Sequence, residues 1–124
     1  MKTIPFFGTC SARSELTLAS QEIPYPFGLC KIRARFPVGC INEMRLSFFV
    51  SMDDFEPAAG KPNGQNVLDE LGQVDYIVGD NDAKEMQHTL IVNESGYYIK
   101  VYADNQDYYD HDVDVQITID PILV

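Results

Sequence analysis

The sequence contains no tryptophan and only three cysteines, Cys10, Cys30 and Cys40. The odd number leaves at least one thiol unpaired, which excludes a dense disulfide framework. Cys30 would lie about 20 Å along a strand from a turn near Pro37–Gly39, whereas a disulfide needs Cα atoms within ~7 Å, so a Cys30–Cys40 bridge is disfavoured. A Cys10–Cys40 bridge stays open beside the default of buried free thiols.

Basic residues are also scarce. Nine Lys and Arg face nineteen Asp and Glu, which gives a net charge of −10. The basic face that nucleic-acid binding requires is not expected. No apolar run approaches the ~20 residues of a membrane span. The apolar cluster IPFF (4–7) is interrupted by Pro5 and followed by Gly8. It is shorter than the ~7–15 residues of a signal-peptide core, so we expect a chain made without a leader.

No long helical periodicity occurs, and a period of two dominates instead. In LCKIRARF (29–36), apolar side chains alternate with Lys31, Arg33 and Arg35. Such alternation predicts strands with one solvated face. The same pattern, strong or weak, predicts seven or eight strands in total, in ranges that include 14–20, 29–36, 43–51, 73–79, 84–93, 96–104 and 112–120.

The connections between these strands complete the predicted architecture. Residues 52–66 are rich in Pro, Gly, Asn and Ala and predict a long excursion, and 66–72 predict a single helical turn capped by Asn66. A chain of 124 residues is long enough for one core. We therefore predict an all-β fold, an antiparallel β-sandwich with jelly-roll or Greek-key topology. Residues 1–12 would be an N-terminal arm, and 13–124 a single sandwich domain.

Charge is divided unevenly along the chain. Residues 1–50 hold six Lys and Arg against three Asp and Glu, a net +3, whereas 51–124 hold three against sixteen, a net −13. Basic N-terminal strands beside acidic C-terminal strands of one fold would produce this division. Complementary faces that meet a copy of the chain or another partner would also produce it.

The stretch DNQDYYDHDVDV (104–115) holds five aspartates and His111. Asp112 and Asp114 occupy outward positions of the last predicted strand, so we expect them to be solvated or paired across the sheet with Lys31, Arg33 or Arg35. The preceding loop has the oxygen ligands that calcium prefers, but its spacing matches no EF-hand. An unliganded polar loop and a calcium site shared with the next acidic loop are the two alternatives. The calcium site would use Asp80, Asp82, Asp104, Asp107 and Asp110. No other cofactor is expected.

Catalytic residues are not evident. His88 and His111 are the only histidines, and no serine or cysteine lies in a nucleophile motif. We predict that the protein is not an enzyme. Aromatic residues at outward positions instead suggest association, although the chain's own arm could cover them and sugar stacking would also use them. The candidate interface residues are Ile4, Phe6, Phe7, Phe49, Tyr98 and Tyr102.

The order of turns and strands carries a resemblance. PYPFG (24–28), FPVGC (36–40) and the C-terminal pair in 96–120 occur in an order that resembles small jelly-roll proteins of bacteriophages and viruses, which decorate capsids or form minor virion parts. GYYIKVYADN (96–105) also resembles the end of secreted pre-peptidase-type β-sandwich domains. The viral resemblance implies a protein that binds itself or a capsid protein.

These observations lead to one hypothesis and one rival. The hypothesis is a non-enzymatic structural protein of a virion, made in the host cytoplasm, whose partners are copies of itself or a capsid protein. Neither nucleic acid nor a membrane is expected as a partner. The rival is a carbohydrate- or calcium-binding module, for which a glycan partner and an extracellular location would be expected.

Overall fold

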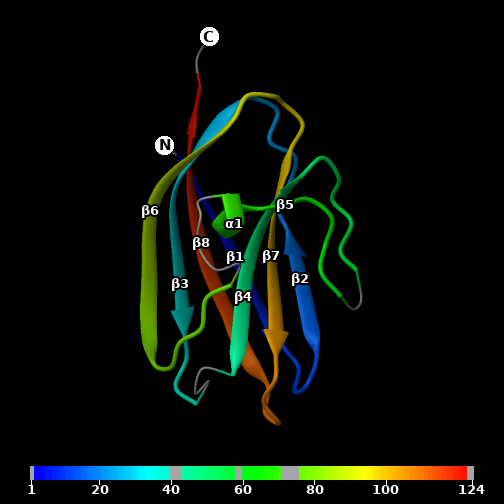
Figure 1. Ribbon diagram of the computed structural model, residues 1–124, viewed down its shortest axis with the longest axis vertical. Coiled ribbons are helices and arrows are strands. Elements are labelled where there is room, and N and C mark those ends of the chain that lie inside the picture. The colour runs from blue at the N-terminus through cyan, green and yellow to red at the C-terminus, as the bar shows by residue number, and fades with distance from the viewer. Residues whose placement is uncertain (1, 40–42, 58–59, 71–75, 123–124) are drawn as a thin grey trace.

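The computed structural model describes residues 2–39, 43–57, 60–70 and 76–122, apart from the side chains of residues 69, 70, 88 and 89. The chain forms two packed antiparallel sheets (Figure 1). The elements in chain order are β1 (Lys2–Cys10), β2 (Glu15–Ala19), β3 (Phe27–Phe36), β4 (Met44–Ser51), β5 (Gln65–Asn66), α1 (Val67–Glu70), β6 (Asp82–Val92), β7 (Tyr98–Asn105) and β8 (His111–Pro121).

The strand order is that of a jelly roll. The first sheet has the order β1-β8-β3-β6 and the second β2-β7-β4-β5. The first strand pairs with the last, and each later strand pairs with the one that precedes the last partner in the chain. The antiparallel pairs are β1 with β8, β2 with β7, β3 with β6, and β4 with β5. A folded ribbon of paired strands wrapped into two sheets is the jelly-roll architecture. The predicted fold class is therefore confirmed.

Alternation along the strands builds the core between the sheets. In β3, Ile32, Ala34 and Phe36 point inward, and Arg33 and Arg35 point out. The same alternation in the other long strands places one apolar face of each sheet in the core. The inward residues include Leu29, Val113, Val115, Ile117 and Ile119 of the first sheet, and Met44, Leu46, Phe48, Val50, Ile99, Val101 and Ala103 of the second.

The N-terminal residues differ from the predicted arm. Lys2–Cys10 form β1, which pairs with β8 of the same chain from Lys2 opposite Ile119 to Cys10 opposite His111. Phe6 points into the core and is 4% exposed. Pro5 argued against a strand in the sequence, because proline has no N–H group to donate. An edge strand tolerates proline because one of its sides has no ladder partner. These residues thus belong to the sandwich and are not an arm laid on another subunit.

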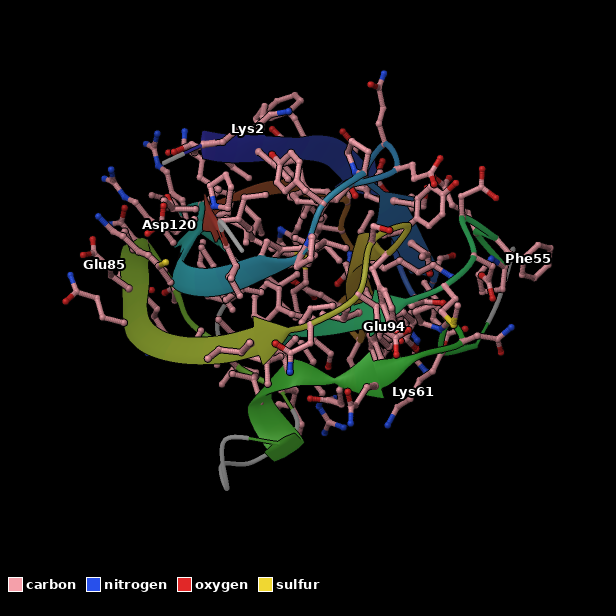
Figure 2. The ribbon with its side chains drawn as sticks, turned by 90° about the horizontal axis from the view of Figure 1, so that it is seen from above. Lys2, Phe55, Lys61, Glu85, Glu94 and Asp120 are labelled. Atoms are coloured by element: carbon pink, nitrogen blue, oxygen red, sulfur yellow. The ribbon has the colours of Figure 1, made fainter. Side chains whose placement is uncertain are left out.

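The connection between β4 and β5 covers the outer face of the second sheet. The ammonium group of Lys100 in β7 lies 2.6 Å from Asp53 Oδ1, and its side chain is fully buried. The backbone N–H groups of Ala19 and Gly60 donate to Glu56 and Glu15, which ties the connection to β2. Figure 2 shows Phe55 of this connection on the side of the molecule opposite to Lys2 and Glu85. Among the described residues, the outer face of the first sheet is the sheet face that remains open.

Most predicted elements agree with the structure; apart from the N-terminal arm, the predicted strand 73–79 differs. The helical turn predicted after Asn66 is α1, whereas Gly72 lies outside the described residues. Of the range 73–79, residues 73–75 also lie outside them, and Ile77 forms only an isolated bridge with Leu46. Within the described part of the chain, no helix is long and apolar enough to cross a membrane.

Candidate functional site

The outer face of the first sheet is the candidate site, and its register fixes which side chains are neighbours. One row across the four strands consists of Phe7, Asp114, Arg35 and Ala83. The next row consists of Pro5, Gln116, Arg33 and Glu85. Residues at such cross-strand positions lie roughly 5 Å apart and point to the same side of the sheet. The face therefore combines one aromatic ring with charges of both signs.

Some polar groups on this face already have partners. Lys31 Nζ lies 3.2 Å from Glu85 Oε1, and this ion pair, with the Lys31 hydrogen bond as the main cause, lowers the pKa of the Glu85 carboxyl. The Thr9 hydroxyl donates to Asp112 Oδ1 at 2.9 Å. Both interactions are exposed to solvent and contribute little stability. They fix the positions of side chains at opposite sides of the sheet.

Three charged side chains on the two central strands of this face are not paired. The side chains of Arg33, Arg35 and Asp114 make no hydrogen bond or ion pair with another residue in the ranges that the structure describes. Arg35 and Asp114 are cross-strand partners in adjacent strands. Their charges are therefore available to a binding partner without first breaking a contact within the chain.

A hollow of about 510 Å³ lies at one end of the face, where β3 leads into the turn at Pro37 and Val38. Phe7 and Val38 stand at this hollow with exposed fractions of 72% and 76%. Its other lining residues are Arg33, Arg35, Phe36, Pro37, Asn81, Asp82, Ala83, Asp112 and Asp114. Large apolar side chains exposed beside unpaired arginine are typical of binding surfaces.

The candidate interface residues divide sharply in the structure. Phe6 belongs to the core, and Ile4 is half-buried against it. Phe49 and Tyr102 point to the outer side of the second sheet but are buried there with their rings edge to face, 6.5 Å between centroids. Tyr98 is half-buried, so Phe7 is the member of this set that remains largely exposed. The predicted interface is thus not one continuous surface.

The aspartates considered for calcium are used to shape turns. Asp80 Oδ1 accepts the Gly39 N–H, and Asp110 Oδ1 accepts the Ala12 N–H. Asp107 accepts from the Tyr108 N–H and bonds His111 Nε2 at 2.9 Å, and the His111 hydrogen bond is the main cause that lowers the pKa of its carboxyl. Asp82 pairs with Lys84, and Asp104 accepts from Gln106. Among the described residues, no three His, Cys, Asp or Glu side chains converge as metal ligands would.

The Cys10 thiol is a poor nucleophile. Burial raises the pKa of the Cys10 thiol to about 11, so the thiol is protonated at neutral pH and reacts poorly. Cys10 and Cys30 are free thiols, and Cys40, the partner considered for Cys10, lies outside the described residues.

Fold and site together define the class: a jelly-roll β-sandwich whose first sheet has an exposed outer face with charges of both signs. No protein-family model and no curated sequence matches the chain. Among solved structures, it is similar to a Yersinia pseudotuberculosis-derived mitogen at 10% identity, with 94% of this chain and 85% of that one covered and a TM-score of 0.49. The Cowpea Mosaic Virus empty virus-like particle matches at 6% identity, with 100% and 86% covered and a TM-score of 0.48. TmCBM61 in complex with β-1,4-galactotriose matches at 10% identity, with 97% and 70% covered and a TM-score of 0.46. These likenesses concern the fold alone.

The sequence did not predict the hollow, nor that Arg33 and Arg35 line it. The alternation in 29–36 placed Arg33 and Arg35 outside, and we expected Asp112 and Asp114 to be solvated beside them. The structure places Arg35 opposite Asp114 in adjacent strands but without an ion pair between them. The signal that could have found the site is the outward parity of Phe7, which becomes visible once 2–10 are read as a strand.

Proposed function

We propose that the protein is a non-enzymatic structural protein that acts by association, as a decoration or minor component of a virion. The observation that carries this proposal is Phe7, exposed beside the unpaired side chains of Arg33 and Arg35 on the outer face of the first sheet. Aromatic and arginine side chains dominate the binding energy of protein interfaces. The virion assignment draws on the jelly-roll order, which viral capsid proteins often use, and on the sequence resemblance.

Light scattering and sedimentation velocity over a range of protein concentrations test association directly. We expect the average mass to rise with concentration. Phe7→Ser should reduce this rise without changing the melting temperature, because the Phe7 ring packs little within the chain. Tyr109→Ser removes another ring that is 73% exposed. It is the matched control and should leave association unchanged.

A second candidate function uses the same hollow. The exposed Phe7 ring could stack on a sugar, and Arg35 and Asp114 could hydrogen-bond its hydroxyl groups, as in other sites that combine one apolar surface with a few polar groups. Jelly rolls also include lectin domains. Binding on a glycan array that disappears with Phe7→Ala, while Tyr109→Ala binds normally, would favour this candidate over association.

A further inference from the structure

We propose that the partner on this face is a second copy of the chain, docked face to face about a two-fold axis that runs parallel to the strands between β8 and β3. This inference rests on the proposed function by association and names the surface and the partner. It follows from the order of the strands and from the register of the residues across them.

The two-fold axis and the strand register together determine which residues of the two copies face each other. Rotation about such an axis places β8 over the partner's β3 and β1 over the partner's β6, while each residue keeps its height along the strands. Because Phe7, Asp114, Arg35 and Ala83 form one row, Asp114 comes to lie over the partner's Arg35. Each contact occurs twice in a two-fold dimer.

The same rotation fits the shape of the hollow. Phe7, the bulky member of its row, comes to lie over the partner's Ala83, the smallest member. Ala83 forms part of the lining of the hollow together with Pro37 and Val38. The exposed ring would therefore enter the partner's hollow beside its Ala83, Pro37 and Val38, within a lining that also holds charged side chains. An aromatic anchor seated in a pocket in this way contributes binding energy.

The charge pattern favours a second copy over a partner of one sign. The face carries Lys31, Arg33 and Arg35 on β3 and acidic residues on the strands at either side of it, Glu85, Asp112 and Asp114. A uniformly acidic or basic partner would meet like charges on part of this surface. A copy related by the proposed axis brings opposite charges together at Arg35 and Asp114, and it places Arg33 and Glu85 over the uncharged Gln116 and Pro5 of the partner. Opposite charges therefore meet in one row and like charges do not meet in the next, which favours this orientation.

The area of the face indicates how strongly two copies should dimerise. Four strands spaced ~4.8 Å apart and nine residues long cover roughly 19 Å by 30 Å. Burying such an area on each copy gives about 1,100 Å² in total, just above the ~1,000 Å² expected of a specific interface. We therefore expect a dimer that dissociates on dilution.

Charge reversal at the central pair tests the proposal. Arg35→Asp places two aspartates opposite one another in both copies of the contact, and Asp114→Arg places two arginines there. We expect each variant alone to dimerise at least tenfold more weakly than the original chain, measured by sedimentation velocity, with an unchanged circular dichroism spectrum. The matched controls, Arg45→Asp and Asp54→Arg, make the same charge changes away from this face and should dimerise normally.

Mixing the two variants gives the decisive result. In a mixed dimer, the aspartate introduced by Arg35→Asp in one chain would face the arginine introduced by Asp114→Arg in the other. The unchanged Asp114 of the first chain and the unchanged Arg35 of the second would form the other contact. An equimolar mixture should therefore recover dimerisation that neither variant shows alone, which an effect within one chain cannot produce.

Three outcomes would overturn the inference in different ways. If the original chain dimerises and the variants dimerise equally well, the interface lies elsewhere. If both variants are weakened and the mixture recovers nothing, Arg35 does not face the partner's Asp114 and the proposed axis is wrong. In both cases association itself stands. A chain that remains monomeric up to ~1 mM, where even a −4 kcal/mol interaction would be visible, contradicts the association proposal as well.

Discussion

Lys100 carries a charge where the sandwich offers almost no water. Its side chain is fully buried beneath the connection that precedes β5, and its ammonium group contacts Asp53 Oδ1 at 2.6 Å. The hydrogen bond from Lys100 is the main cause that lowers the pKa of the Asp53 carboxyl. Since an unpaired buried charge is strongly unfavourable, the pairing holds the connection against the sheet.

A double-mutant cycle measures this pair. We expect Asp53→Asn to lower the melting temperature, because it leaves the buried ammonium group without its carboxylate. Lys100→Met replaces the charge with a side chain of similar volume and should cost less. The double variant should melt above Asp53→Asn alone, and the neighbouring Asp54→Asn is the control. A double variant that melts below both single variants would show that the pair does not act as a unit.

Tyr102 and Glu15 form a second contact at the outer face of the second sheet. The Tyr102 hydroxyl donates to Glu15 Oε1, and the Gly60 N–H donates to Oε2. These bonds, first that from Tyr102, lower the pKa of the Glu15 carboxyl below its ordinary value of 4.5. Because the folded pKa is lowered, the stabilisation is complete above pH 4.5 and is lost as the pH falls through the lower, folded value.

Tyr102→Phe should therefore show a stability defect that depends on pH. At pH 7 the loss of one hydrogen bond costs about 1 kcal/mol, or roughly 4 °C in melting temperature for a domain of this size. The difference in melting temperature should become smaller in acid, where Glu15 becomes protonated in both the original chain and the variant. Thermal unfolding from pH 7 to pH 3 measures it, with Tyr109→Phe as the exposed control. A defect of the same size at every pH would contradict the role assigned to the charged carboxyl.

At the scale of elements, two neighbouring phenylalanines of β1 should contribute very differently to stability. Phe6 is buried in the core and Phe7 is exposed on the opposite side of the same strand. Phe6→Ala should cost about 3–5 kcal/mol of unfolding free energy, whereas Phe7→Ala should change it by no more than about 0.5 kcal/mol. Urea unfolding at a concentration where the chain is monomeric measures both values. Equal losses would mean that Phe7 also packs within the chain.

The strands that were predictable are those whose alternation reflects burial on one side only. In β8 and in residues 31–36 of β3, apolar residues alternate with charged or polar ones, so period and register could be derived from the sequence there. The register shift between Leu29 and Lys31 could not be derived in this way. In β1, Pro5 and Gly8 obscured the pattern, and only the pairing with β8 shows that these residues continue the sheet. The local sequence signals a break there, whereas the edge of a sheet tolerates it.

The outer face of the second sheet could not be predicted for a different reason. Parity along the strands correctly placed Phe49 and Tyr102 on its outer side, and an outer side is normally solvated. Residues 52–57 and 60–64 of the following connection cover them instead, held by Asp53 and Glu56. Where a long connection comes to lie depends on contacts between segments far apart in the sequence, and local periodicity contains no information about them.

At the scale of the whole molecule, the uneven charge of the sequence has a structural counterpart. The basic strand β3 lies between the acidic β8 and the acidic end of β6, as Arg35 opposite Asp114 and the Lys31–Glu85 ion pair show. Basic N-terminal strands beside acidic C-terminal ones in one fold, the simpler of the two interpretations, are therefore present. The net charge of −10 nevertheless remains on each copy and opposes self-association.

Raising the ionic strength should therefore strengthen the proposed dimer. Two charges of −10 separated by roughly 30 Å in water repel by about 14 kcal/mol before screening. With Debye lengths of ~30 Å at 0.01 M and ~8 Å at 0.15 M salt, this repulsion falls from about 5 to about 0.3 kcal/mol. The exposed Arg35–Asp114 contacts would lose at most ~1 kcal/mol each over the same range. Relief of the net repulsion is larger, so sedimentation velocity should show tighter dimers at 0.15 M than at 0.01 M. Weaker association at the higher salt concentration would mean that local ion pairs, rather than the total charge, control how two copies meet.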